Sequence, residues 1–140
     1  MNRRHFALAG LAAVLCAGCE PTPPTEADGR AALEGTLRAK FPNIAFNVKD
    51  FRKTNGVSNS PMYQMYYVAT IEFPNGVAPA AKGFWNDFMA SGDVQARLML
   101  LASKGFRITE GDSIRQRTVM QANSAITFVK SERGWTYSID

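Results

Sequence analysis

Histidine and cysteine are almost missing from this 140-residue sequence, which contains one histidine and two cysteines. His5, Cys16 and Cys19 all fall within the first nineteen residues, so residues 20–140 contain neither residue type. A Ser-His-Asp or Cys-His catalytic apparatus therefore has no histidine or cysteine to draw on in that stretch. Zinc sites built from imidazole or thiolate ligands, and an internal disulfide, are excluded there on the same ground.

A long hydrophobic run is also missing. The apolar run at residues 6–17 is only about a dozen residues long, whereas a membrane-spanning helix needs roughly 20. It follows Arg3 and Arg4 and leads into small residues and a cysteine. A basic start, a short apolar run and small residues are typical of an export signal rather than of a folded element. The paired arginines fit a twin-arginine signal as well as an ordinary one, and both export routes stay open.

The export signal ends in the sequence Leu-Cys-Ala-Gly-Cys. Ala17, Gly18 and Cys19 resemble the end of a bacterial lipoprotein signal, although Cys16 stands where leucine is usual. The resemblance implies that Cys19 carries a diacylglycerol on its thiol and that residues 1–18 are removed as a signal peptide. The alternative is an ordinary secretory signal, after which Cys19 is lost or left free.

Lipidation would decide where the protein is held. Each buried acyl methylene contributes about 0.8 kcal/mol, so several acyl chains keep a small domain at a bilayer surface. Glu20 follows the cysteine where, in this family, an aspartate would direct retention in the inner membrane. The resemblance therefore implies an outer-membrane anchor in the cell envelope, with the domain facing the periplasm.

The excess of positive charge is small. Arg3 and Arg4 are two of the 16 basic residues, which leaves 14 against 12 acidic residues once the signal is removed. Binding to nucleic acid requires clustered cations well in excess of this balance. We therefore expect no nucleic-acid partner, and we also expect no cofactor and no metal.

The next stretch is expected to connect the anchor to a single domain. Residues 19–25 contain three prolines, which favour an extended, lipidated tether. Residues 26–140 show no repeat and no second boundary. Thr25 and Asp28 have the spacing of a capping box at a helix N-terminus, and Pro42 ends that helix.

Alternation of apolar residues predicts strands in two places. The clearest is residues 62–73, where every second side chain from Tyr63 to Phe73 forms one apolar face. A shorter strand is expected at residues 44–48. Asn55-Gly56 and the polar run through Ser60-Pro61 then have the composition of a loop.

Helical signals follow in the second half. Residues 79–88 fit a short helix or an aromatic loop, and Ser91 or Asp93 is expected to cap a firmer helix that ends at Gly105. Beyond residue 108 the sequence favours strands. The last expected elements are a weak strand at 114–122 and a hairpin between 125–130 and 135–139.

These elements predict an α+β fold, with an N-terminal helix packed on a curved antiparallel sheet of four to five strands and an inserted helical segment. Their order resembles cystatin-like and nuclear-transport-factor-like folds. The inhibitory Gln-x-Val-x-Gly segment of cystatins is missing, so the resemblance does not imply protease inhibition. Residues 128–135 also resemble the final hairpin of small uncharacterised proteobacterial lipoproteins, which implies no activity.

Polar candidates for a site are few. Glu110 and Asp112 stand near a turn and could hold a hard cation or act as an acid and base, although exposed turn carboxylates are common. Arg115 and Arg117 would share one strand face, either facing an anionic partner or forming a solvated edge. Neither pair indicates a particular reaction.

The strongest candidate for a functional surface is aromatic. Met62 and Tyr66 lie on the second face of the 62–73 strand and, with Trp85, could form an interaction surface, because tyrosine and tryptophan serve interfaces well. Burial under residues 79–105 is the alternative. The leading hypothesis is a non-enzymatic, lipid-anchored accessory or binding module that acts through an envelope protein. The alternatives are a small-ligand domain with a pocket between helix and sheet, and a carboxylate-based hydrolase of envelope glycans.

Overall fold

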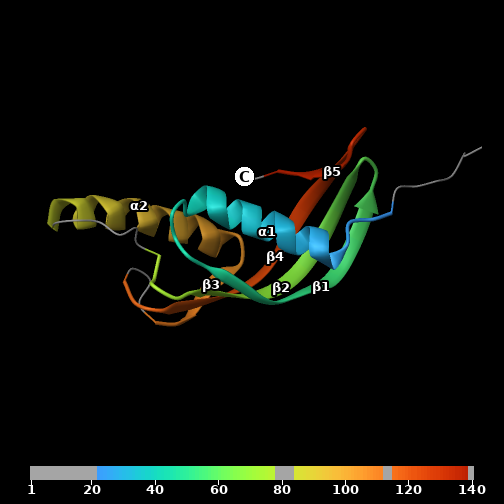
Figure 1. The fold of residues 1–140 in the computed structure, drawn as a ribbon. Helices are drawn as coiled ribbons and strands as arrows, with labels where there is room; N and C mark the ends of the chain where they lie inside the picture. Colours follow the sequence, from blue (N-terminus) through green and yellow to red (C-terminus); the bar gives the residue numbers. More distant parts are fainter. Residues whose placement is uncertain (1–21, 78–83, 112–114, 139–140) are drawn as a thin grey trace, which may run out of the picture.

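The computed structural model describes residues 22–77, 84–111 and 115–138; in α2 (residues 84–103), side chains are described only from Val94 onward. The fold is α+β, with two helices and a five-stranded antiparallel sheet in the order β1-β2-β4-β3, and β5 pairs with β4 (Figure 1). The elements are α1 (Glu26–Lys40), β1 (Asn47–Asn59), β2 (Met62–Phe73), α2 (Phe84–Ser103), β3 (Phe106–Glu110), β4 (Thr118–Ser131) and β5 (Gly134–Tyr137).

The start of α1 confirms the expected capping box. The backbone N–H of Thr25 donates to Asp28 Oδ2 over 2.7 Å, and the N–H of Asp28 donates to Thr25 Oγ1 over 3.2 Å. The helix buries one face against the sheet and ends just before Phe41. Gly29 permits this packing, because a Cβ there would collide with the sulfur of Met65 and the ring of Phe51.

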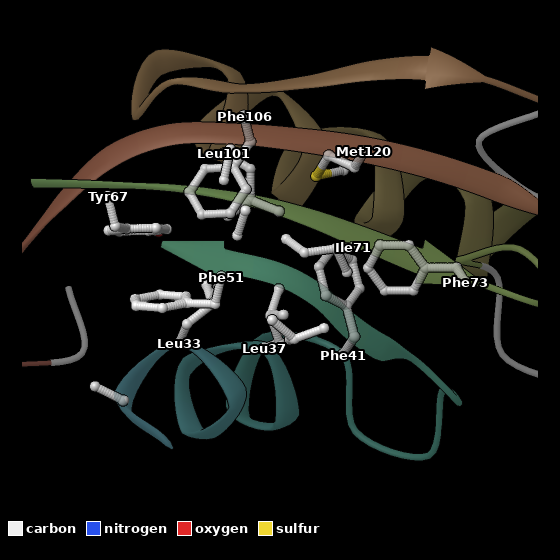
Figure 2. Close-up of a cluster of buried hydrophobic side chains, with 14 of the residues drawn as sticks. Leu33, Leu37, Phe41, Phe51, Tyr67, Ile71, Phe73, Leu101, Phe106 and Met120 are labelled. Carbon is white, nitrogen blue, oxygen red and sulfur yellow. The ribbon is translucent and has the colours of Figure 1, made fainter. Parts of the chain in front are cut away.

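Strand β2 has the bounds and the buried face that its alternation predicts. It pairs with β1 on one side and with β4 on the other. Its buried side chains meet those of both helices in one hydrophobic core (Figure 2). The largest side chains without solvent exposure include Phe41, Phe73, Phe128, Leu33, Leu37, Met65 and Ile71.

The loop expected from Asn55 through Pro61 is wrong for residues 55–59, because these belong to β1. Only Ser60 and Pro61 form the turn before β2. Two register shifts break the alternation of β1, between Lys49 and Arg52 and again between Lys53 and Asn55. Pairing with β2 overrides the local turn signal. A Cβ at Gly56 would collide with the hydroxyl of Tyr63, so glycine is needed here for close packing.

The expected strand at residues 44–48 is also displaced, since β1 begins only at Asn47. Ile44 and Phe46 pack against the core from the connection before it. The alternating apolar residues therefore lie in an irregular segment that packs on the core and not in a strand.

The second helix is longer than its caps suggest. It begins at Phe84, so a cap at Ser91 or Asp93 is wrong; both lie within the helix, and residues 79–83 lie outside the described part. The expected end is confirmed, because Gly105 follows the helix with a φ of 91°. Its N–H donates to the carbonyl of Ala102 over 3.2 Å.

The C-terminal hairpin is confirmed, with Ser131 paired to Gly134 and Phe128 paired to Tyr137. Its first arm belongs to the continuous strand β4, which replaces the two shorter strands expected over residues 114–130. Ile139, expected in the second arm, lies outside the described residues.

Candidate functional site

One face of the sheet packs against the helices, and the opposite face, which we call the open face, carries the alternate residues of β2. Met62 lies opposite Asn59 of β1 and Val129 of β4 in the strand register. Tyr66 lies opposite Asn55 and Ala125, between the same two strands. The backbone that carries Met62 and Tyr66 is therefore hydrogen-bonded to a neighbouring strand on each side of β2.

Exposed apolar side chains are concentrated on the open face. Four of the six large hydrophobic side chains that the described residues leave exposed lie here: Val57, Met62, Tyr66 and Val129, at 47%, 45%, 39% and 38% exposure. We call these four residues the open-face patch. Facing side chains on paired strands lie roughly 5 Å apart, so Met62 and Val129 are direct neighbours.

Tyr66 is held in place within this patch. Its hydroxyl donates to Gln64 Oε1 over 3.0 Å, so the side chain leans along β2 toward Met62. Gln64 itself pairs with Val57 across the β1–β2 ladder. The ring is thus exposed but oriented, which lowers the entropy that it would lose on binding.

Trp85, the third residue of the expected surface, lies on a different element from Met62 and Tyr66. Its backbone lies in the first turn of α2, and α2 contributes Val94, Leu98 and Leu101 to the core on the helix-covered side of the sheet. The side chain of Trp85 lies outside the described part. Of the three residues expected to form the surface, Met62 and Tyr66 therefore lie in the open-face patch.

Sequence reasoning missed Val57 and Val129. Val57 follows the turn-like pair Asn55-Gly56 and was therefore not assigned to a strand. Both valines join the patch through the pairing register of β1 and β4 with β2. Val129 was expected within the hairpin arm 125–130, whereas for Val57 the only local signal was its β-branched side chain.

A broad open hollow of about 1140 Å³ adjoins the patch. Arg52 on β1 and Arg107 on β3 line opposite sides of it, and neither side chain has an ion-pair partner in the described part of the chain. Glu26 and Asp50 also line it, so the charge of the hollow is balanced. Between the two arginines lie Val68, Thr70, Gln121 and Asn123.

Two smaller hollows lie beside the helices. One has a volume of about 510 Å³ and lies between α1 and its connection to β1, lined by Arg30, Glu34 and Phe46 among others. The cleft between α1, α2 and β4 has a volume of about 120 Å³, whereas small-molecule pockets are typically about 300–1,000 Å³. Tyr67 lines this cleft, and burial raises the pKa of its phenol well above the usual value. A neutral, buried phenol is not an activated nucleophile at physiological pH.

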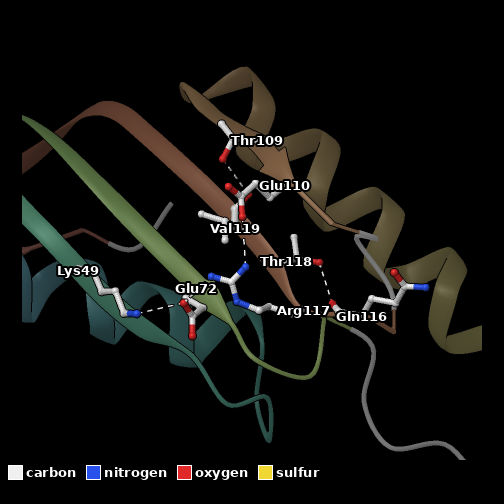
Figure 3. Close-up of polar contacts among 8 residues, drawn as sticks. All are labelled: Lys49, Glu72, Thr109, Glu110, Gln116, Arg117, Thr118 and Val119. Carbon is white, nitrogen blue, oxygen red and sulfur yellow. Dashed lines mark hydrogen bonds and ion pairs between the residues drawn. The ribbon is translucent and has the colours of Figure 1, made fainter.

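An ion-pair network lies at the end of the open face that is farther from Met62 (Figure 3). Glu72 Oε2 accepts from Lys49 Nζ and from Arg117 Nη2, each over 3.0 Å, and Arg117 Nη1 reaches Glu110 Oε2 over 3.1 Å. The hydrogen bond from Lys49, followed by that from Arg117, lowers the pKa of Glu72 below its usual value. The same carboxylates raise the pKa of Arg117.

This network changes the interpretation of the polar candidates. Glu110 is paired with Arg117 rather than with a second carboxyl group, and Asp112 lies outside the described residues. Arg115 and Arg117 do not share a strand face, because both precede β4. In the described ranges, no group of three histidine, cysteine, aspartate or glutamate side chains is placed to hold a metal ion.

We expect Glu72→Gln to make the free energy of unfolding depend less steeply on pH in the acid range. The folded chain holds the pKa of this carboxyl below its value in the unfolded chain, so its contribution is present at neutral pH and is lost as pH falls below about 4. Urea unfolding at a series of pH values measures this. Glu132→Gln, in the exposed β4–β5 turn, is the control and should keep the parent's pH dependence; identical curves for all three proteins would contradict the assignment.

In the part of the chain that the structure describes, no helix is long and apolar enough to cross a membrane. No protein-family model, curated protein or solved structure matches this chain. Because a fold alone does not define an activity, the function must be argued from the site.

Proposed function

We propose that this protein is a lipid-anchored periplasmic accessory module, without enzymatic activity, that binds an envelope protein through its open-face patch. The observation that carries the proposal is the concentration of exposed apolar side chains on the sheet face that the helices leave uncovered. Contiguous exposed apolar surface in a small domain is typical of an interaction site.

The chemistry of the patch suits a protein partner. Tyrosine and methionine are enriched at the centres of protein interfaces, where a large side chain can be desolvated at low entropic cost. The polar hollow beside the patch, flanked by Arg52 and Arg107, supplies hydrogen-bonding groups for the rim of such an interface. The combination of an apolar centre and a polar rim favours a macromolecule over a small ligand.

The anchor is the second part of the proposal. Residues 15–19 resemble a lipoprotein signal, so Cys19 is the proposed lipidation site and residues 1–18 the proposed signal peptide. The membrane is thus a partner through the lipid on Cys19, and the outer membrane, facing the periplasm, is the proposed location. An anchored domain with an uncovered apolar face is suited to contact at the envelope rather than to turnover.

We also retain the expected curvature of the sheet as part of this proposal. The two register shifts in β1 are of the kind that bends a strand and increases its twist. A bent β1 would partly enclose the hollow beside the patch.

Replacing Tyr66 by alanine is expected to weaken partner binding by about 2 kcal/mol, or roughly 30-fold, because central interface aromatics contribute at this level. The measurement is the amount of partner recovered by crosslinked pull-down of the acylated protein from its own envelope, read by mass spectrometry. Met99→Ala is the matched control, since Met99 is 74% exposed but lies on α2. Equal recovery with Tyr66→Ala and with the parent, at unchanged thermal stability, would contradict the proposal.

A further inference from the structure

The segment before α1 contacts the domain from Thr22 onward, although its prolines suggest an extended tether as far as Thr25. The indole N–H of Trp135 donates to the backbone carbonyl of Thr22 over 2.8 Å. Pro24 is buried, and Thr25 caps α1. Of the seven residues expected to form the tether, Thr22 to Thr25 therefore contact the domain, and only three precede this point of attachment.

The attachment point lies at one end of the sheet. The ring of Trp135 in β5 lies 6.1 Å from that of Tyr63, which is close to the start of β2. The N–H of Lys130 donates to the carbonyl of Pro61 over 2.9 Å, so the β1–β2 and β4–β5 turns are neighbours. We call residues 59–62 and 130–134 the turn end; Figure 1 shows the start of the described chain, before α1, on this side of the sheet and α2 at the opposite end.

Chain length then limits how far the turn end can lie from an anchor. Cys19 precedes Thr22 by three residues, and three consecutive Cα–Cα steps span at most about 11 Å. An acyl group on Cys19 would hold this residue at the headgroup level of the bilayer. Thr22, and with it Trp135, must then lie within this short distance of the membrane surface.

We propose that the turn end is a membrane-facing surface and that the domain stands end-on on the lipid headgroups. This inference rests on the proposed acylation of Cys19. The side chains at the turn end suit this environment: Pro61 and Met62 are exposed apolar groups, and the exposed Lys130 and Arg133 outnumber the single acid Glu132. Basic residues next to an apolar contact favour a surface of anionic phospholipids.

This orientation constrains the partner of the open-face patch. Tyr66 lies four residues beyond Met62 along β2, which is about 13 Å farther from the turn end. The patch then rises from the bilayer with Met62 lowest and Tyr66 above it. A protein that contacts both residues must itself lie in or on the same membrane.

Depth measurements on single-cysteine variants test the inference, because the chain after Cys19 contains no other thiol. Acylated Met62→Cys and Met99→Cys proteins, each labelled with an environment-sensitive fluorophore, are bound to vesicles of phosphatidylethanolamine with a minority of phosphatidylglycerol. A quencher carried on the lipid headgroup should quench the label at position 62 severalfold more than the label at position 99. Equal quenching of proteins that float with the vesicles would overturn the inference and leave the anchor intact.

Two further outcomes distinguish the acyl anchor from the orientation of the domain. Failure of both labelled proteins to float with the vesicles would overturn the proposed anchor and the inference with it. Insertion of a Gly-Ser linker of about ten residues after Pro21 should keep flotation but reduce the quenching at position 62 to the level at position 99. Unchanged quenching with the longer linker would show that the short attachment does not set the orientation.

Discussion

Cys19→Ala is expected to move the protein from the membrane fraction to the soluble periplasmic fraction. The proposed anchor consists of acyl chains on this one thiol, and each buried methylene contributes about 0.8 kcal/mol to membrane binding. Removing the thiol removes every chain at once, so the expected effect is a nearly complete loss of retention. Cell fractionation and vesicle flotation of the purified protein measure it.

The sequence offers a matched control for this experiment. Cys16 stands three residues earlier within the expected signal, and Cys16→Ala should leave the protein in the membrane fraction. Membrane binding of Cys19→Ala at the parent's yield would contradict lipidation at this residue. The same release by both variants would show that membrane retention does not depend specifically on the Cys19 thiol.

Phe73→Ala is expected to destabilise the domain by about 3–5 kcal/mol, because it leaves a large cavity in the core. Phe73 has no solvent exposure, and its ring centroid lies 5.6 Å from that of Phe41 in an edge-on arrangement. The ring centroid of Phe46 lies 6.3 Å from that of Phe73. A domain of this size typically has about 5–15 kcal/mol of total stability, so the variant should be marginally folded.

Urea unfolding followed by circular dichroism measures this loss. Met99→Ala is again the control, because the side chain is 74% exposed and its truncation should change stability by at most about 0.5 kcal/mol. A change as small for Phe73→Ala as for Met99→Ala would contradict the description of the core.

Local chemistry explains which elements could be predicted. The capping box at Thr25 and Asp28 depends on residues three apart, and the C-cap at Gly105 depends on one residue that tolerates a positive φ. Strand β2 is buried on one face over its whole length, so its alternation is complete. Each of these signals depends only on residues that are close together in the sequence.

The elements that could not be predicted depend on contacts between distant residues. Strand β1 includes Asn55 and Gly56 only because β2 pairs with them. Helix α2 continues through Ser91 and Asp93, residue types that cap helices when nothing else holds the preceding turn.

The open-face patch was predictable to the same extent. Alternation placed Met62 and Tyr66 on one face of β2, whereas Val57 and Val129 joined them only through strand register. The Arg52–Arg107 hollow likewise spans strands that are far apart in sequence. A single strand can be predicted from its pattern, but a surface made by four strands cannot.

The most direct test of the account is photo-crosslinking in the living envelope. A photoreactive amino acid replaces Tyr66 in the acylated protein and, in a control, replaces Met99 on α2. The account predicts a discrete protein adduct from position 66, recovered with the membrane fraction, and no such adduct from position 99. The absence of any protein adduct at position 66, or the same adduct from both positions, would contradict binding through the open face.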